Sequence, residues 1–182
     1  MRKLPVATLA LAVLLLSGCV PESHRATPTP TPSATPVFAS EDEALAAAED
    51  AYAAYESAVD ASLSTYDTTS LSQVATGTAL QAAKDSVDSF KKQGRKLTGH
   101  SQIDSVRFAQ SAGLTGPDPT AEIEIYGCLD IGATDVVDSS GASVVPSSRV
   151  DRISMLISLE LDRSNGLLVS SADVWDGDDF CN

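Results

Sequence analysis

The stretch SEDEALAAAEDAYAAYESAVDASLST, residues 40–65, opens the part of the chain that is expected to fold, and its periodicity sets the fold class. Its apolar residues recur at steps of three and four, which predicts an amphipathic helix of about six turns. Ser40 and Glu43 form a capping box at its start. Tyr52 and Tyr55 fall on the buried stripe, where we expect core aromatics with a polar tip at the rim. As an alternative, they are candidate ligand-binding residues.

Apolar residues keep a helical spacing in the next two segments, and after them apolar and polar residues alternate. Residues 67–75 predict a short helix or helical turn, and residues 78–93 predict a third helix that ends at Gly94. From Leu97 onward apolar and polar residues alternate, which is typical of strands. The expected strands cover residues 103–110, 120–130, 132–138 (the weakest), 149–162 and 167–175, with a turn at 116–119 and a hairpin turn at 164–166.

Helices followed by antiparallel strands indicate an α+β domain in which the helices pack on one face of a curved antiparallel sheet. This order resembles the cone fold of the nuclear-transport-factor-like (SnoaL-like) superfamily, which also occurs in actinobacterial lipoproteins. The resemblance covers about residues 40–176 and rests on element order and the long first helix. It implies a pocket between the first helix and the concave face of the sheet. The other interpretation is a small α+β lipoprotein domain of another type.

The N-terminus has the features of an export signal. Arg2 and Lys3 form a basic start, and residues 6–16 are apolar apart from Thr8. This run is too short for a bilayer core, which needs about 20 apolar residues. We therefore expect export rather than a transmembrane span.

The residues that follow the apolar run resemble the lipobox of bacterial lipoproteins. They read Leu16-Ser17-Gly18-Cys19, and the resemblance implies that residues 1–18 are a signal peptide and that Cys19 takes a diacylglycerol. The expected location is the cell membrane, lipid-anchored, on the extracytoplasmic face. The alternative is an ordinary secreted protein with a chance cysteine.

Residues 19–39 are expected to form a lipidated, Pro/Thr-rich tether, and residues 40–182 a single α+β domain. Proline fixes φ and lacks an N–H, so the tether favours extended polyproline II. A solvated spacer is the simplest interpretation. The alternatives are a segment with sugars on its hydroxyls or a ligand for a proline-binding domain.

The cysteines give a pairing expectation that depends on the lipobox. If Cys19 takes lipid, Cys128 and Cys181 remain in an oxidising compartment, where a disulfide would hold the C-terminal tail to a strand. The alternative is a reactive or metal-binding pair of thiols, which no neighbouring histidine accompanies.

The net charge argues against two classes of partner. The chain carries a formal net charge of −13, so its surface repels nucleic acid and anionic lipid headgroups. Four cations gather where the third helix should end, and interaction with the helix dipole explains them; they are Lys91, Lys92, Arg95 and Lys96.

The sequence has few residues in patterns suited to catalysis or metal binding, so we expect no cofactor, no metal and no catalytic residue. An enzyme would have to use Tyr52 or Tyr55 as hydrogen-bond donors and Asp60 as base, but Asp60 is more simply a surface charge. His100 is expected to be solvated. The acidic residues 173–179 are expected to form a solvated tail rather than a calcium site.

The leading functional expectation is a non-catalytic binding or scaffold domain presented at the cell envelope, with an envelope protein or a small ligand as partner. The alternatives are a carrier or sensor of a small apolar ligand in a cone-shaped pocket and, third, a lyase- or isomerase-type enzyme. A filled cone would favour a scaffold, and an open apolar cavity a carrier. An open cavity with converging Tyr, Asp and His would favour an enzyme.

Overall fold

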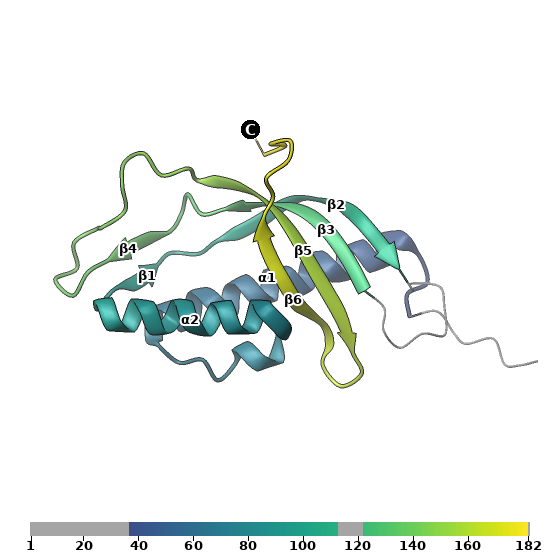
Figure 1. Cartoon of the computed structure of the whole chain (residues 1–182), viewed down its shortest axis with the longest axis horizontal. Helices are drawn as coiled ribbons and strands as arrows, with labels where there is room; N and C mark the ends of the chain where they lie inside the picture. Colours follow the sequence, from purple (N-terminus) through teal and green to yellow (C-terminus); the bar gives the residue numbers. More distant parts are fainter. Residues whose placement is uncertain (1–36, 113–121, 182) are drawn as a thin grey trace, which may run out of the picture. The chain divides into compact units, whose positions relative to one another are not determined.

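The computed structural model describes residues 37–112 and 122–181. These residues form two α-helices, a 3-10 turn and two antiparallel sheets (Figure 1). The elements in chain order are α1 (Glu41–Thr65), η1 (Leu71–Gln73), α2 (Gly77–Gln93), β1 (Lys96–Thr98), β2 (Gln102–Ala112), β3 (Glu122–Asp130), β4 (Asp135–Val137), β5 (Arg152–Asp162) and β6 (Gly166–Val174).

The larger sheet is an antiparallel meander with the strand order β2-β3-β5-β6. Ile125 on β3 is paired with both Phe108 on β2 and Ile157 on β5. Register shifts interrupt the β2–β3 and β5–β6 ladders, and such irregularities bend strands. The smaller sheet consists of β1 and β4, which lie to one side of the larger sheet in Figure 1.

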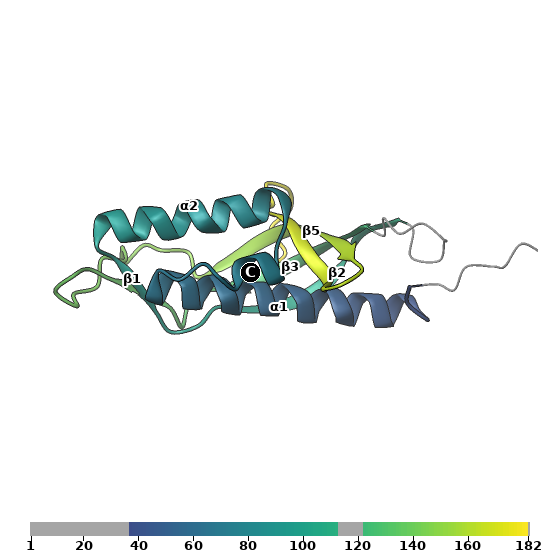
Figure 2. The same ribbon diagram turned by 90° about the horizontal axis from the view of Figure 1, so that it is seen from below.

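Both helices pack on the same face of the larger sheet, and Figure 2 shows them side by side. The core between helices and sheet consists of small residues from the helices and branched residues from the strands. It includes Ala44, Ala48, Tyr52, Tyr55, Ala79 and Ala83 from the helices and Ile123, Ile125, Met155, Ile157, Leu159 and Val169 from the strands. Alanines on α1 and α2 let the helix backbones approach the sheet closely, so the inner face of this sheet is filled.

A smaller apolar cluster joins the helices to the two-stranded sheet. Leu63 on α1, Val87 on α2 and Leu97 on β1 are its buried members. Two hydrogen bonds fix the end of α1 beside β1: Ser64 Oγ donates to the Leu97 carbonyl at 2.8 Å, and Tyr66 Oη donates to the Arg95 carbonyl at 2.8 Å. These contacts hold β1 against the last turns of α1.

The α+β class is confirmed, and so are the long first helix and the last hairpin. The capping box of α1 is present, since the Glu43 amide donates to Ser40 Oγ at 3.1 Å and Glu43 Oε2 accepts from the Ala39 amide at 2.8 Å. Gly94 ends α2 with φ +64°, and Lys91 and Lys92 lie in its last turn.

The helical turn expected within residues 67–75 is present as the 3-10 turn η1. Three expectations differ from the structure. The weak strand at 132–138 shrinks to β4. The strand β1 was not predicted, because its three residues carry no alternating pattern long enough to recognise. Asp60, expected on the surface, is only 5% exposed.

Several expectations lie outside the described residues. They are the signal peptide, Cys19, most of the tether and the turn at 116–119. Within residues 37–112 and 122–181, no helix is both long enough and apolar enough to cross a membrane.

Candidate functional site

The candidate site is a cavity of about 430 Å³ between the C-terminal half of α1, the β1–β4 sheet and the loop that follows β4. We call it the main cavity. Most of its lining is apolar, and a few polar side chains join it. The lining residues are Glu56, Val59, Asp60, Leu63, Phe90, Arg95, Leu97, Ser101, Ile131, Thr134, Val136, Val144, Val145, Pro146 and Arg149.

Two carboxyl groups from α1 belong to this lining. Glu56 and Asp60 are four residues apart, so one helical turn places both side chains on the same face of α1. Asp60 Oδ2 accepts two hydrogen bonds from Ser101, at 2.8 Å from the backbone amide and 2.9 Å from Oγ. The same hydroxyl lies 3.3 Å from Glu56 Oε2. Ser101 therefore links the two carboxyls to the segment between β1 and β2.

Burial and a neighbouring carboxyl affect the protonation of Glu56. Burial raises the pKa of Glu56 above its ordinary value of 4.5, and the nearby Asp60 carboxyl raises it further, while contacts with Tyr52 and Ser101 act in the opposite direction. Glu56 therefore keeps its proton to a higher pH than a surface glutamate would.

Arg149 fixes the opposite wall of the main cavity. Its guanidinium donates to the backbone carbonyls of Ile131 and Thr134, both at 3.0 Å, and its Nε donates to Asp151 Oδ1 at 2.8 Å. These bonds connect the loop after β3 to the segment before β5. Its role in this structure is to hold two loops together, and Asp151 balances its charge.

A second cavity, of about 420 Å³, lies between the N-terminal half of α1 and the β5–β6 turn. We call it the second cavity. Its lining includes Phe38, Ala51, Val74, Leu161 and Leu167, with Asp50 as its one ionisable side chain. Its polar lining residues are Asp50, Gln73 and Asn165.

The two tyrosines proposed as ligand-binding residues lie in the core. Tyr52 is 0% exposed, Tyr55 is 6% exposed, and their ring centroids are 5.8 Å apart. The Tyr55 hydroxyl points to the Ala79 carbonyl at 3.5 Å. Neither ring lines the main or the second cavity. Burial, and then Glu56, raises the pKa of Tyr55 to about 12 and that of Tyr52 well above its ordinary value, so both remain neutral phenols.

Cys128 lies on the face of β3 opposite to Ile123 and Ile125, which pack against the helices, and Cys181 belongs to the C-terminal tail. Cys128 and Cys181 form a disulfide. Cys128 is completely buried under the tail. The two thiols expected to pair are therefore brought together, and the tail lies over β3 as expected.

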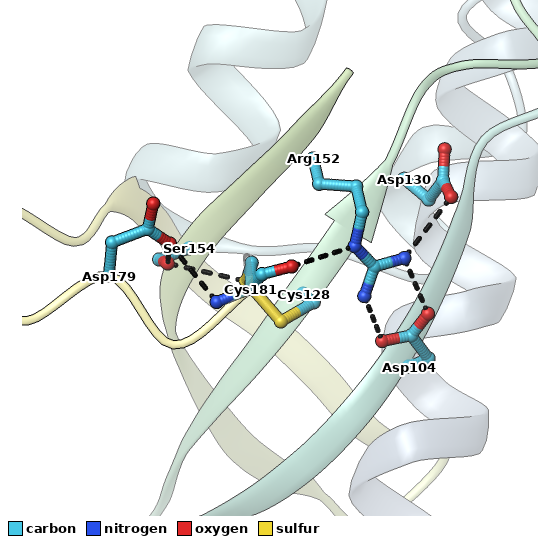
Figure 3. Close-up of a disulfide and its surroundings, with 7 residues drawn as sticks. All are labelled: Asp104, Cys128, Asp130, Arg152, Ser154, Asp179 and Cys181. Atoms are coloured by element: carbon cyan, nitrogen blue, oxygen red, sulfur yellow. Dashed lines mark hydrogen bonds and ion pairs between the residues drawn. A yellow bond between two sulfur atoms is a disulfide. The ribbon is translucent and has the colours of Figure 1, made fainter. Parts of the chain in front are cut away.

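Polar contacts around the disulfide also hold the tail (Figure 3). Arg152 Nε donates to the Cys181 carbonyl at 3.0 Å, and the same guanidinium forms ion pairs with Asp104 and Asp130. Asp179 accepts hydrogen bonds from Ser154 Oγ at 3.1 Å and from the Cys181 amide at 3.0 Å. Arg152 also lowers the pKa of Asp104 below its ordinary range.

Aromatic side chains complete this outer face. Tyr126 lies 4.9 Å from Trp175 and 5.8 Å from Phe180, measured between ring centroids. The Arg107 guanidinium lies 4.4 Å from the Phe180 centroid. Trp175 is thus half-buried in packing between strand and tail. No cluster of three or more His, Cys, Asp or Glu side chains in the described part of the chain is arranged to hold a metal ion.

Sequence reasoning missed Glu56, Ser101 and Arg149 as members of the site. A usable signal was the spacing of Glu56 and Asp60, which places two acids on the same helix face as Val59 and Leu63. Ser101 and Arg149 carry no such signal, because each joins the site through contacts far along the chain. His100 is exposed, as expected.

Comparisons with known proteins add a weak likeness of fold. No protein-family model matches the chain, and no curated protein matches it. Among solved structures, the chain is similar to the intermembrane space region of chloroplast protein ARC6, at 15% identity and a TM-score of 0.49, covering 71% of this chain and 95% of that one. It is also similar to a periplasmic fragment of TraM, at 16% identity and a TM-score of 0.46, covering 74% of this chain and 96% of that one. Both TM-scores are below one half, so these likenesses assign neither a function nor a location to this chain.

Proposed function

We propose that this chain is a lipid-anchored extracytoplasmic protein whose domain binds a small, largely apolar ligand in the main cavity. The observation that carries the proposal is the cavity itself, with a volume of about 430 Å³ and a lining that includes Phe90, Leu97 and Val136. Ligand sites typically measure about 300–1,000 Å³, with mostly apolar walls and a few placed polar groups. The main cavity has these properties.

The open apolar cavity favours a carrier or sensor, although it does not lie where the resemblance placed the pocket. The space between the helices and the larger sheet is filled by residues such as Ile125 and Ile157, and that part of the domain alone would favour a scaffold. The main cavity lies beyond this core, beside the β1–β4 sheet. The enzyme hypothesis needed tyrosine hydroxyls in the cavity, and Tyr52 and Tyr55 pack in the core instead.

A neutral apolar probe tests the binding function. We expect 1-octanol to bind the full chain saturably in a calorimetric titration, with Cys19→Ala present so that no acyl chain of the protein competes for the cavity. Val145→Trp should abolish binding by filling the cavity, because Val145 is in its lining.

The matched control is Val150→Trp, which makes the same change in the same loop at a side chain that is 64% exposed and outside the lining. This control should bind octanol as the parent does. An absence of saturable binding in the parent, or equal loss in both variants, would contradict the proposed function.

The anchor remains a proposal that the first residues support. Arg2 and Lys3, the apolar run 6–16 and the cysteine after Gly18 together match a bacterial lipobox. Two or three acyl chains hold a protein on a membrane stably, at about 0.8 kcal/mol per buried CH₂. Cys19→Ala should remove both lipid labelling and membrane fractionation, and unchanged labelling would refute the anchor.

The nuclear-transport-factor-like cone is the finer part of the fold proposal. Its support is the order of elements, with α1 and α2 preceding an antiparallel meander and packing on one of its faces. In a cone of this type the pocket would lie between the first helix and the sheet. The main cavity has α1 as one wall, and its other wall comes from the β1–β4 sheet and the loops around it.

A further inference from the structure

We propose that the ligand of the main cavity is an organic cation, an apolar body that carries an ammonium group, and that Glu56 and Asp60 receive this group. The inference rests on the proposed function and specifies the chemical class of its ligand. It is carried by the placement of two carboxyls in the lining of a cavity whose other walls are mostly apolar.

The carboxyl pair is positioned before a ligand arrives. Asp60 is 5% exposed, and both of its bonds from Ser101 go to Oδ2. The Ser101 hydroxyl oxygen also lies 3.3 Å from Glu56 Oε2, so the same residue contacts both carboxyls. Pre-oriented acceptors lose little conformational entropy when they receive a charged donor.

The charges around the cavity leave the carboxyl pair without a full set of opposite charges. Arg149 is already used, because it donates to two loop carbonyls and pairs with Asp151 at 2.8 Å. Arg95 is the remaining cation in the lining, which holds two carboxyl groups. A cationic ligand group would correct this imbalance, and a hydrogen-bonded charge pair in a partly buried site is stronger than one in water.

The protonation of Glu56 points the same way. Burial raises the pKa of Glu56, and the neighbouring Asp60 carboxyl adds to the effect because two negative charges at close range repel each other. A bound ammonium group would relieve this repulsion. The net charge of −13 on the chain would also draw organic cations toward the protein.

The apolar lining determines the remainder of the ligand. Leu63, Phe90, Leu97 and Val136 surround the space beyond the carboxyls. A hydrated inorganic cation would gain nothing from these walls, whereas an alkyl or cyclic body would lose its contact with water there. An amine with a hydrophobic body satisfies both parts of the cavity.

Three probes of one length and different charge test the inference: n-octylammonium, 1-octanol and octanoate. Each is titrated calorimetrically into the full chain carrying Cys19→Ala, at one pH and one ionic strength. We expect octylammonium to bind at least about tenfold more tightly than octanol, with octanoate the weakest. Glu56→Gln and Asp60→Asn should each reduce the preference for octylammonium over octanol severalfold while octanol affinity changes little.

Glu49→Gln is the matched control, since it removes the same charge from an exposed position two turns earlier on α1. It should leave the preference intact. Equal affinity for octylammonium and octanol would overturn the inference and leave the proposed function standing. So would tighter binding of octanoate, which would mean that Arg95 selects the ligand. A Glu56→Gln effect no larger than that of Glu49→Gln would overturn it too, and binding of none of the three probes would contradict the proposed function itself.

Discussion

At the scale of single residues, Glu56 and Asp60 have the same functional group and different surroundings. Asp60 is anchored by two hydrogen bonds from Ser101, which is 41 positions further along the chain. Glu56 is half-buried, has one contact with the same serine at 3.3 Å and lies next to a second carboxyl. Asp60 therefore has two donors on one oxygen, whereas burial and the second carboxyl push Glu56 toward its protonated form.

This difference predicts how stability depends on pH. Because the pKa of Glu56 is raised in the folded chain, its contribution to stability is fully present below its ordinary value of 4.5 and is lost as the pH rises through the folded value. Glu56→Gln removes this loss. We expect the free energy of unfolding of the variant, relative to the parent, to increase between about pH 4 and about pH 8 in urea titrations.

Other charged and titratable groups near Glu56 stay in place in this experiment; they are Tyr52, Tyr55 and Asp60 on α1 and Arg95 and Arg149 in the cavity lining. Glu49→Gln again serves as the exposed control and should show no such trend. A Glu56→Gln variant whose relative stability is flat across this range would show that the carboxyl is not perturbed.

The site shows why residue-scale features resist prediction from sequence. The buried stripe of α1 is periodic and could be found, including Tyr52 and Tyr55. The burial of Asp60 depends on the segment that contains Ser101, and the sequence of α1 itself gives no indication of this partner. From the sequence alone, an acidic residue on an alanine-rich helix is interpreted as a surface charge, because the segment that covers it is not known.

At the scale of elements, local signals predicted the long pieces. The Ser40 cap and the helical period placed α1 to within a residue, and Gly94 placed the end of α2. The hairpin of β5 and β6 followed from alternation and the turn between them. The strands β1 and β4 have three residues each and are stabilised by pairing Leu97 with Val136, so they could not be recognised from either segment alone.

The start of α2 contains a close approach that can be tested. Gly77 has φ +53°, and a Cβ there would lie 2.9 Å from the Ser170 carbonyl oxygen on β6. Gly77→Ala should therefore combine the strain of a left-handed backbone with a backbone clash, at a cost of about 1–3 kcal/mol in the free energy of unfolding. Urea unfolding of the variant measures this loss.

A substitution at Gly141 distinguishes the effect of backbone strain from that of the clash. Its φ is +84°, but no atom lies within 4 Å of the position that a Cβ would take. Gly141→Ala should thus be destabilised by backbone strain alone and by less than Gly77→Ala. Equal losses in the two variants would mean that the packing of α2 against β6 is looser than the structure shows.

At the scale of the whole molecule, the larger sheet separates two environments. On one face, the helices cover a filled core that leads to the main cavity at the β1–β4 end. On the other face, the tail is held by the Cys128–Cys181 bond, by Arg152 and by aromatic packing on Tyr126 (Figure 3). The tail thus stabilises the sheet from the face that the cavity does not use.

The disulfide should contribute to global stability. It joins residues 53 positions apart, and the loop-entropy description gives about 4 kcal/mol for a loop of this size. Reduction should lower the free energy of unfolding by an amount of this order, measured in urea with and without reductant. The double variant Cys128→Ala/Cys181→Ala controls for the reductant and should be insensitive to it; a parent that is equally insensitive would show that the thiols are not bonded.

If the main cavity binds a small apolar cation, titration with n-octylammonium should change the backbone amide NMR spectrum of the isotope-labelled chain. We expect saturable shifts centred on the main cavity, strongest near Val59, Leu97 and Ser101, with Val74 and Leu167 of the second cavity unchanged. Shifts centred on the second cavity, or no saturable shifts at all, would contradict the proposed binding.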